Sequence, residues 1–163
     1  MREGGPPVRG RPPGRPPRTL RKAPAGPGGP ARTGGPPSKL LQAALAAREH
    51  AFAPYSKFKV GAALEDIAGR IHTGCNVENA TYGLTICAER VAVFKAISEG
   101  ARQFRRIAIA ADTDTLTPPC GACRQILWEF CGDVELVLVN PRGKTETCHL
   151  KELFPKPFDV SYL

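Results

Sequence analysis

The sequence lacks several features that would place the protein in a membrane or outside the cell. None of its apolar runs approaches the roughly 18–20 residues that a membrane-spanning helix needs, and its N-terminus has no apolar core of a secretory signal. Six cysteines among 163 residues are too few for a disulfide-stabilised scaffold, which favours reduced thiols or a bound metal. These absences exclude a membrane protein, a secreted peptide toxin and a collagen-like fibre, and they predict a soluble, cytoplasmic protein.

Residues 1–37 lack almost everything that a folded core requires. They contain 11 Pro, 9 Gly and 7 Arg, no aromatic residue, and a single acid, Glu3. A segment with so little to bury cannot offset the entropy of ordering its backbone, so we predict a disordered tail at 1–37 and one folded domain at 38–163. With eight basic residues and one acid, the tail carries +7 of the net charge of +8, which leaves +1 for the domain.

The composition of the tail permits two interpretations. Its spaced arginines could bind nucleic acid or another anionic surface. It has no aromatic side chain on which bases could stack, and its prolines prevent the amphipathic helix of an organellar transit peptide. We favour an unstructured extension that takes no part in the chemistry.

From Ser38 onward the sequence alternates between helical and strand-like patterns. Helices are predicted from Ser38 to about Phe52, over 87–99 and over 120–130, and strands over 58–64, 70–75, 104–111 and 134–139, with a short strand and a helical turn after them. Two strands followed by helix, strand, helix and strand are typical of one mixed sheet with helices packed on its faces. We therefore predict an α/β fold.

Three of the six cysteines lie at the starts of predicted helices. Cys87 opens one helix, and Cys120 and Cys123 open the next, three residues apart and hence on one helical face. The partial positive charge of a helix N-terminus favours thiolates, so the two helix starts could present three thiolates to one cation. Three protein ligands leave a coordination position for water, which is the arrangement of a catalytic zinc.

Two charged residues beside Cys87 complete this pattern. Glu89 can take a proton from water and deliver it to a substrate. Arg90 can donate hydrogen bonds to the sulfurs and offset the negative charge of three thiolates. Residues 87–89 (Cys-Ala-Glu) and 119–123 (Pro-Cys-Gly-Ala-Cys) together match the signature of zinc-dependent deaminases.

Three other interpretations of the cysteines remain open. A structural four-thiolate zinc site would take its fourth ligand from the remaining cysteines, which are otherwise small core residues: Cys75, Cys131 and Cys148. A thioredoxin-like redox pair at Cys120 and Cys123 would leave Cys87 and Glu89 without a function. A non-catalytic zinc module likewise has no use for a carboxylate beside an open coordination position.

The domain resembles a known family, the small homotetrameric cytidine deaminases, over about 38–158. Besides the two zinc motifs, the resemblance rests on residues 54–58 (Pro-Tyr-Ser-Lys-Phe), 60–64 (Val-Gly-Ala-Ala-Leu) and 76–80 (Asn-Val-Glu-Asn-Ala). It implies a three-layer α/β/α sandwich with a mixed five-stranded sheet and one zinc ion per subunit. It also implies hydrolytic deamination of free cytidine and deoxycytidine to uridine and deoxyuridine with release of ammonia, a step of pyrimidine salvage.

The resemblance further implies a role for each matching residue. Zinc would be held by Cys87, Cys120 and Cys123, with Glu89 as the proton shuttle and Arg90 supporting the sulfurs. Substrate would be bound by Phe58 at the pyrimidine face, the Ala88 N–H at the base edge, and Asn76 and Glu78 at the ribose hydroxyls. Neighbouring subunits of the family complete each other's sites, and the residues expected to act in this way are Ala80, Tyr82 and Phe158.

The reaction that the resemblance implies adds water to C4 of cytosine. Glu89 would protonate N3 and then carry a proton to the exocyclic amine, which leaves as ammonia. The nearest alternative is a deaminase of the same fold that acts on another aminopyrimidine such as blasticidin S, although Asn76, Glu78 and Phe158 favour a free nucleoside. An enzyme that edits polynucleotides would need a positively charged groove, which a domain of net charge +1 does not supply.

Overall fold

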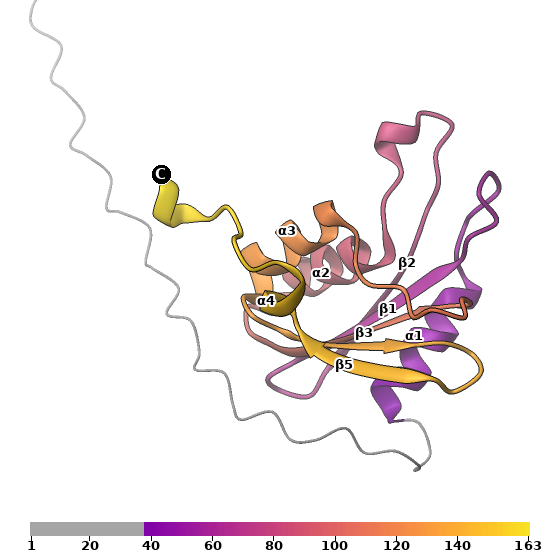
Figure 1. Ribbon diagram of the computed structural model, residues 1–163, viewed down its shortest axis with the longest axis horizontal. Helices are drawn as coiled ribbons and strands as arrows, with labels where there is room; N and C mark the ends of the chain where they lie inside the picture. Colours follow the sequence, from indigo (N-terminus) through magenta and orange to yellow (C-terminus); the bar gives the residue numbers. More distant parts are fainter. Residues whose placement is uncertain (1–37) are drawn as a thin grey trace, which may run out of the picture.

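The fold is built on a mixed five-stranded sheet, as predicted. The computed structural model describes residues 38–163 (Figure 1), and the tail predicted at 1–37 lies outside the described residues. The strands follow the spatial order β2-β1-β3-β4-β5, with bounds β1 Val60–Asp66, β2 Ile71–Cys75, β3 Phe104–Ala111, β4 Glu135–Val139 and β5 Thr145–His149. The pair β3–β4 is parallel, and the pairs β1–β2, β1–β3 and β4–β5 are antiparallel.

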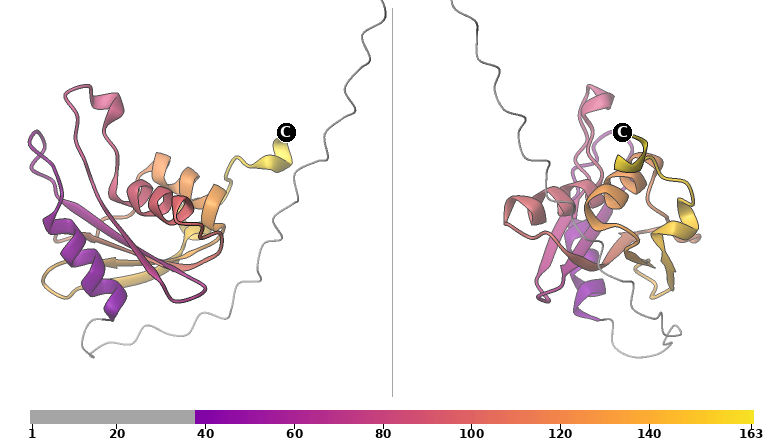
Figure 2. Two further views of the ribbon diagram at one scale, coloured as in Figure 1. Left: turned by 180° about the vertical axis from the view of Figure 1, so that it is seen from behind. Right: turned by 90° about the vertical axis from the view of Figure 1, so that its left-hand side faces the viewer.

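Helices cover both faces of this sheet. The helix α1 (Lys39–Glu49) lies on one face, and α2 (Ala88–Ser98) and α3 (Gly121–Cys131) lie on the other (Figure 2). Neighbouring strand residues alternate between the two layers: Ala63 packs in the cluster with Leu40 of α1, whereas Leu64 packs in the cluster with Val93 of α2. The three-layer α/β/α prediction is therefore confirmed.

Two glycines let α1 and α2 lie close to the sheet. A Cβ atom at Gly61 would lie 2.2 Å from the carbonyl oxygen of Ala44 in α1, and one at Gly74 would lie 2.5 Å from the carbonyl oxygen of Ala88 in α2. Any larger side chain would push the helices outward. Gly74 in particular fixes the height of the first turn of α2 above the sheet, and this turn carries several of the predicted site residues.

The boundaries of two elements differ from the prediction. The first helix ends at Glu49, before Pro54 rather than at Phe52, and β1 begins at Val60, so Phe58 lies in the preceding loop. The Asn76 side chain explains the later start of the strand, because its amide accepts from the Val60 N–H at 2.8 Å and donates to the Phe58 carbonyl at 2.8 Å.

Three short helical segments complete the described chain: η1 Tyr82–Leu84, α4 Leu150–Leu153 and η2 Val160–Tyr162. The turn α4 confirms the helical turn predicted after the last strand. None of the helices in residues 38–163 combines the length and the apolar character that crossing a membrane would require.

Candidate active site

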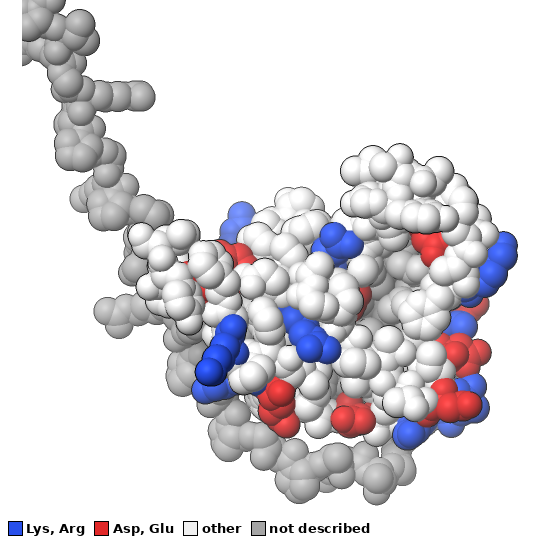
Figure 3. Space-filling model, turned by 45° about the horizontal axis from the view of Figure 1, so that its top comes forward, with Lys and Arg blue, Asp and Glu red and all other residues white. Residues whose placement is uncertain are grey.

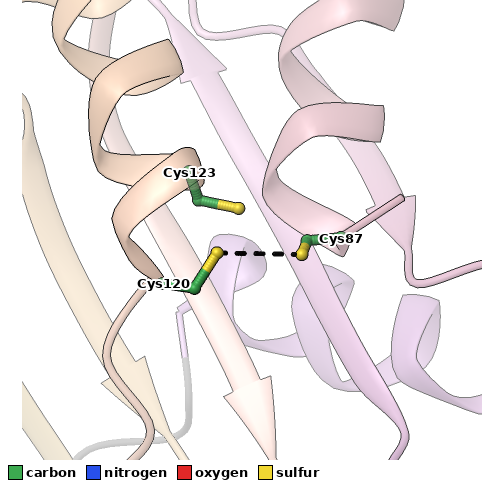
Figure 4. A group of neighbouring side chains, drawn as sticks. All are labelled: Cys87, Cys120 and Cys123. Carbon is green, nitrogen blue, oxygen red and sulfur yellow. Dashed lines mark hydrogen bonds between the residues drawn. The ribbon is translucent and has the colours of Figure 1, made fainter. Parts of the chain in front are cut away.

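The three cysteines at the helix starts come together as predicted. Cys87 is the N-cap residue of α2, Cys120 is the N-cap residue of α3, and Cys123 lies in the first turn of α3. The three sulfur atoms lie within 4.8 Å of one another, and those of Cys87 and Cys120 are 3.9 Å apart (Figure 4). Both helices therefore direct their N-termini, with the partial positive charge they carry, at one thiol cluster.

The geometry of the cluster fits zinc. Thiolates bind zinc at about 2.3 Å in tetrahedral sites, which puts their sulfur atoms about 3.8 Å apart. The distance of 3.9 Å between the Cys87 and Cys120 sulfurs agrees with this value. Cys75, Cys131 and Cys148 do not join the group, so within the described part of the chain the four-cysteine alternative has no support.

One sulfur of the cluster, that of Cys87, already favours the thiolate form. The pKa of the Cys87 thiol is lowered to about 5, chiefly by a hydrogen bond from Cys123 and further by the guanidinium of Arg90. The pKa of Cys123 is raised, because its thiol donates this hydrogen bond and is buried. A metal ion takes the place of such shared protons when it binds.

Arg90 supports the cluster from the first turn of α2, three residues after Cys87. Its Nη2 atom lies 3.6 Å from the Cys87 sulfur and donates a hydrogen bond to the Thr85 carbonyl at 3.0 Å. The guanidinium thereby ties Cys87 to the loop that precedes it and adds positive charge beside the sulfur.

Glu89 lies in the first turn of α2, two residues after Cys87. Its side chain is buried, with the residue only 5% exposed, and burial raises the pKa of the carboxyl to about 7. A carboxyl with this pKa can both take up and release a proton near neutral pH. The neighbouring Ala88 is also buried and is the first residue of the helix, where backbone N–H groups have no acceptor within the helix.

The Glu78 carboxylate is held by the loop that precedes β1. It accepts hydrogen bonds from the Tyr55 N–H at 2.8 Å, from the Ser56 N–H at 3.2 Å and from the Ser56 hydroxyl. These bonds, the Ser56 hydroxyl first among them, lower the pKa of Glu78. The carboxylate is therefore kept ionised and fixed in orientation.

A pocket of about 390 Å³ opens beside Glu78. Its lining residues come from the loop before β1 and from the segment between β2 and α2: Tyr55, Ser56, Glu78, Tyr82 and Thr85. The cysteines are not part of this lining, and the link to them runs through Thr85, whose carbonyl accepts from Arg90. Tyr55 and Ser56 belong to the sequence pattern at 54–58, and their hydrogen bonds to Glu78 give them a role that the sequence did not indicate.

Three of the predicted substrate residues lie on exposed parts of the chain. Phe58 is exposed in its loop, Tyr82 is 75% exposed in η1, and Phe158 is 56% exposed near the C-terminus. Ala80 is exposed as well, just before η1. Figure 1 shows η1 and the C-terminal segment with η2 projecting on opposite sides of α2 and α3. One chain therefore does not bring all predicted substrate residues together.

The surface carries charged side chains of both signs. On the face in Figure 3, Lys and Arg side chains are separated by acidic and uncharged ones. This distribution agrees with the net charge of +1 for 38–163 and gives no basic groove for a polynucleotide on that face.

Comparisons with known proteins match the part of the chain that contains the thiol cluster and Glu89. The family described as the cytidine and deoxycytidylate deaminase zinc-binding region matches residues 36–139. A cytidine deaminase of Sporosarcina psychrophila is 48% identical over 128 residues, which cover 76% of this chain and 94% of the relative. A cytidine deaminase of Halalkalibacterium halodurans is 50% identical over 120 residues, covering 73% of this chain and 91% of the relative.

Solved structures give the same result. The crystal structure of a cytidine deaminase from Burkholderia pseudomallei superposes with a TM-score of 0.71 at 48% identity, covering 73% of this chain and 96% of that one. The crystal structure of a cytidine deaminase from Mycobacterium tuberculosis superposes with a TM-score of 0.65 at 39% identity, covering 74% and 95% of the two chains.

Proposed function

The chain belongs to the cytidine and deoxycytidylate deaminase family, and we propose that it deaminates free cytidine and deoxycytidine hydrolytically, with release of ammonia. The observation that carries the proposal is the cluster of three thiols at two helix starts beside the buried Glu89. The proposal includes a role in pyrimidine salvage and a cytoplasmic location. Six free thiols, as the described residues have them, suit a reducing compartment.

The proposed deamination requires a metal ion and one carboxyl group, that of Glu89. Cys87, Cys120 and Cys123 would hold zinc, whose Lewis acidity makes water nucleophilic near neutral pH. Glu89 would take a proton from the attacking water, deliver it to N3 of the pyrimidine, and carry a second proton to the departing amine. The Ala88 N–H would hold the base edge, since it has no acceptor within the helix.

The ribose would be bound beside Glu78. Its ionised carboxylate can accept hydrogen bonds from ribose hydroxyls in the pocket that it lines. The Asn76 side chain bonds the Phe58 carbonyl and the Val60 N–H, which uses one of its two N–H groups and one of its two oxygen lone pairs. We propose that the other N–H and lone pair bond a ribose hydroxyl. Asn76 would thus also place Phe58 against the pyrimidine face.

We propose further that the enzyme is a homotetramer whose subunits complete each other's sites. The support is geometric: η1, which carries Tyr82, and the C-terminal segment, which carries Phe158, project from opposite sides of the same chain (Figures 1 and 2). Both aromatic side chains are largely exposed in a single chain, as expected of residues that another copy covers. Ala80, just before η1, would act in the same way.

A mixing experiment tests the sharing of sites. Tyr82→Ala and Glu89→Gln chains, each almost inactive alone, would be co-expressed with different affinity tags and purified through both. If Tyr82 acts across the interface, random assembly restores up to about a quarter of the sites, because an intact Glu89 then meets an intact Tyr82 of a neighbour. If Tyr82 acts within its own chain, the mixed oligomer stays inactive.

Ammonia release tests the reaction itself. The purified, zinc-loaded protein would be given cytidine and deoxycytidine, with a chelator-stripped sample alongside. We expect release that is lost with the zinc and returns when zinc is added back. A folded, zinc-loaded protein that releases no ammonia from either nucleoside would contradict the proposal, and blasticidin S would then be the first alternative substrate to assay.

A further inference from the structure

Arg124 lies near the start of α3, and its side chain connects two backbone carbonyls that are far apart in the sequence. Its Nε atom donates to the Pro119 carbonyl at 2.8 Å, and its Nη1 atom donates to the Leu153 carbonyl at 2.9 Å. The side chain is half-buried between α3 and α4, which lie side by side in Figure 1. One guanidinium thus joins the residue before Cys120 to the last residue of α4.

The first of these contacts fixes the approach to the metal cluster. Pro119 is fully buried and directly precedes Cys120. The peptide that joins the two residues is oriented by the hydrogen bond to the Pro119 carbonyl, and this orientation sets the direction of the Cys120 side chain. Cys120 makes no side-chain capping bond of its own. Its carbonyl accepts from the Arg124 N–H at 2.9 Å, and the bond to the Pro119 carbonyl holds the peptide on its other side.

The second contact reaches the C-terminal segment. The chain leaves α4 at Leu153 and runs to Phe158, whose carbonyl accepts a hydrogen bond from the Gln125 side chain at 2.8 Å. Arg124 and Gln125 are neighbours in α3 and hold the two ends of this six-residue stretch, 153–158. The helix that presents Cys120 and Cys123 therefore also holds the segment that carries Phe158.

We infer that Arg124 is a positioning residue that orients Cys120 and couples the metal cluster to the C-terminal segment at 154–158. The inference rests on the proposed function in one respect, namely that Cys120 binds zinc. Arg is suited to this task because its planar fork donates in two fixed directions, whereas the point charge of Lys cannot hold two carbonyls in one geometry.

Zinc release measures the first half of the inference without any substrate. Zinc-loaded Arg124→Lys would be mixed with a chromogenic chelator, and release followed over time. We expect release about 10- to 100-fold faster than from the unaltered protein, the range in which outer-shell partners alter metal affinity. Unaltered release would overturn the inference, whether or not the protein deaminates cytidine.

Arg102→Lys is the matched control. The Arg102 guanidinium also bonds two backbone carbonyls, those of Ile97 at 2.7 Å and Ala101 at 2.8 Å, but it lies beyond the far end of α2. We expect this variant to release zinc as slowly as the unaltered protein. Equal acceleration in both variants would show a general effect of losing a guanidinium and would overturn the inference. If Arg124→Lys does not fold, Arg124→Gln carries the same comparison.

Hydrogen exchange measures the coupling to the C-terminal segment. In zinc-loaded protein, the amides that this segment contains, those of Phe154, Lys156 and Phe158 on either side of its two prolines, should exchange faster in Arg124→Lys than in the unaltered protein or in Arg102→Lys, because one end of the segment is released. Unchanged exchange in this segment would overturn the coupling, even if zinc release were faster.

Discussion

The two ends of α2 use buried charge in opposite ways. At the N-terminal end, Glu89 is buried with a pKa raised to about 7, and Cys87 faces two further thiols. Just beyond the C-terminal end, Glu99 lies 2.6 Å from the imidazole of His72. Among the described residues, Glu89 at the first end forms no salt bridge, whereas the carboxylates at the second end are paired with basic side chains.

The paired end is a chain of polar contacts across three elements. His72 of β2 lies between Glu99 and Asp66, with its Nε2 atom 3.4 Å from the Asp66 carboxylate. Arg70 reaches the same carboxylate at 2.7 Å. Burial alone would raise the pKa of Asp66, but the hydrogen bonds from Arg70 and then His72 lower it to about 2.

The contrast shows what a buried carboxyl group contributes to activity at one end of α2 and to stability at the other. A buried carboxyl that forms no salt bridge costs stability and gains the ability to exchange protons. A buried carboxylate with two basic neighbours stabilises the fold and is locked in its charge state. Substitutions at the first end should therefore remove activity and leave stability, and those at the second end should do the reverse.

The sharpest test of the N-terminal end is Glu89→Gln. The amide cannot carry protons, so we expect kcat to fall by about 10²- to 10⁴-fold, the usual contribution of general acid–base catalysis. Zinc content, measured by metal analysis, and the urea unfolding midpoint should not fall. Glu129→Gln, an exposed change on α3, serves as the control. Retained turnover in Glu89→Gln would remove the carboxyl from the mechanism.

Arg90→Ala should have the second-largest effect. Loss of the guanidinium removes the donor that lies 3.6 Å from the Cys87 sulfur and the tie to Thr85. We expect activity and zinc affinity to fall by about 10- to 100-fold, measured by turnover and by competition with a chelator. Arg102→Ala, beyond the other end of α2, should change neither. If turnover and zinc affinity stay unaltered in Arg90→Ala, the guanidinium does not support the sulfurs.

The difference between the two ends also explains how much the sequence could predict. Cys87 and Glu89 are two residues apart, and Cys120 and Cys123 are three apart, so local spacing was enough to predict the thiol cluster and its carboxyl. The mixed sheet followed from the order of apolar patterns. These features depend on short-range periodicity, which a single sequence displays.

The features that sequence could not predict depend on contacts between distant residues. His72 and Glu99 are 27 residues apart, and Arg124 and Leu153 are 29 apart. Nothing in local spacing distinguishes the side chains of His72, Glu99 and Arg124 from solvated ones. Phe58 illustrates the same limit, because the alternating pattern extended the strand to it while the Asn76 amide holds that stretch as a loop.

His72→Ala tests the paired end. The change leaves the buried Asp66 with one partner fewer, and such a loss costs about 1–3 kcal/mol of unfolding free energy. Urea unfolding should report this loss, while kcat of the folded enzyme stays as it was. His50→Ala, at an exposed position, is the control. A fall in kcat without a fall in stability would mean that the two ends of α2 are not separate in function.

The smallest effect concerns the pH dependence of stability. The pKa of Asp66 lies below its ordinary value of 3.8 in the folded protein, at about 2, so its contribution is fully present above pH about 4 and is lost as pH falls towards 2. Many carboxylates titrate in this range, and for that reason the difference between the unaltered protein and Asp66→Asn is the useful quantity. We expect Asp66→Asn to have the lower urea midpoint at pH 6, and the gap to narrow steadily between pH 4 and pH 2. A difference in urea midpoint that stays constant over that range would mean that Asp66 stabilises the fold by its shape and hydrogen bonds alone. The contrast in charge between the two ends of α2 would then not hold.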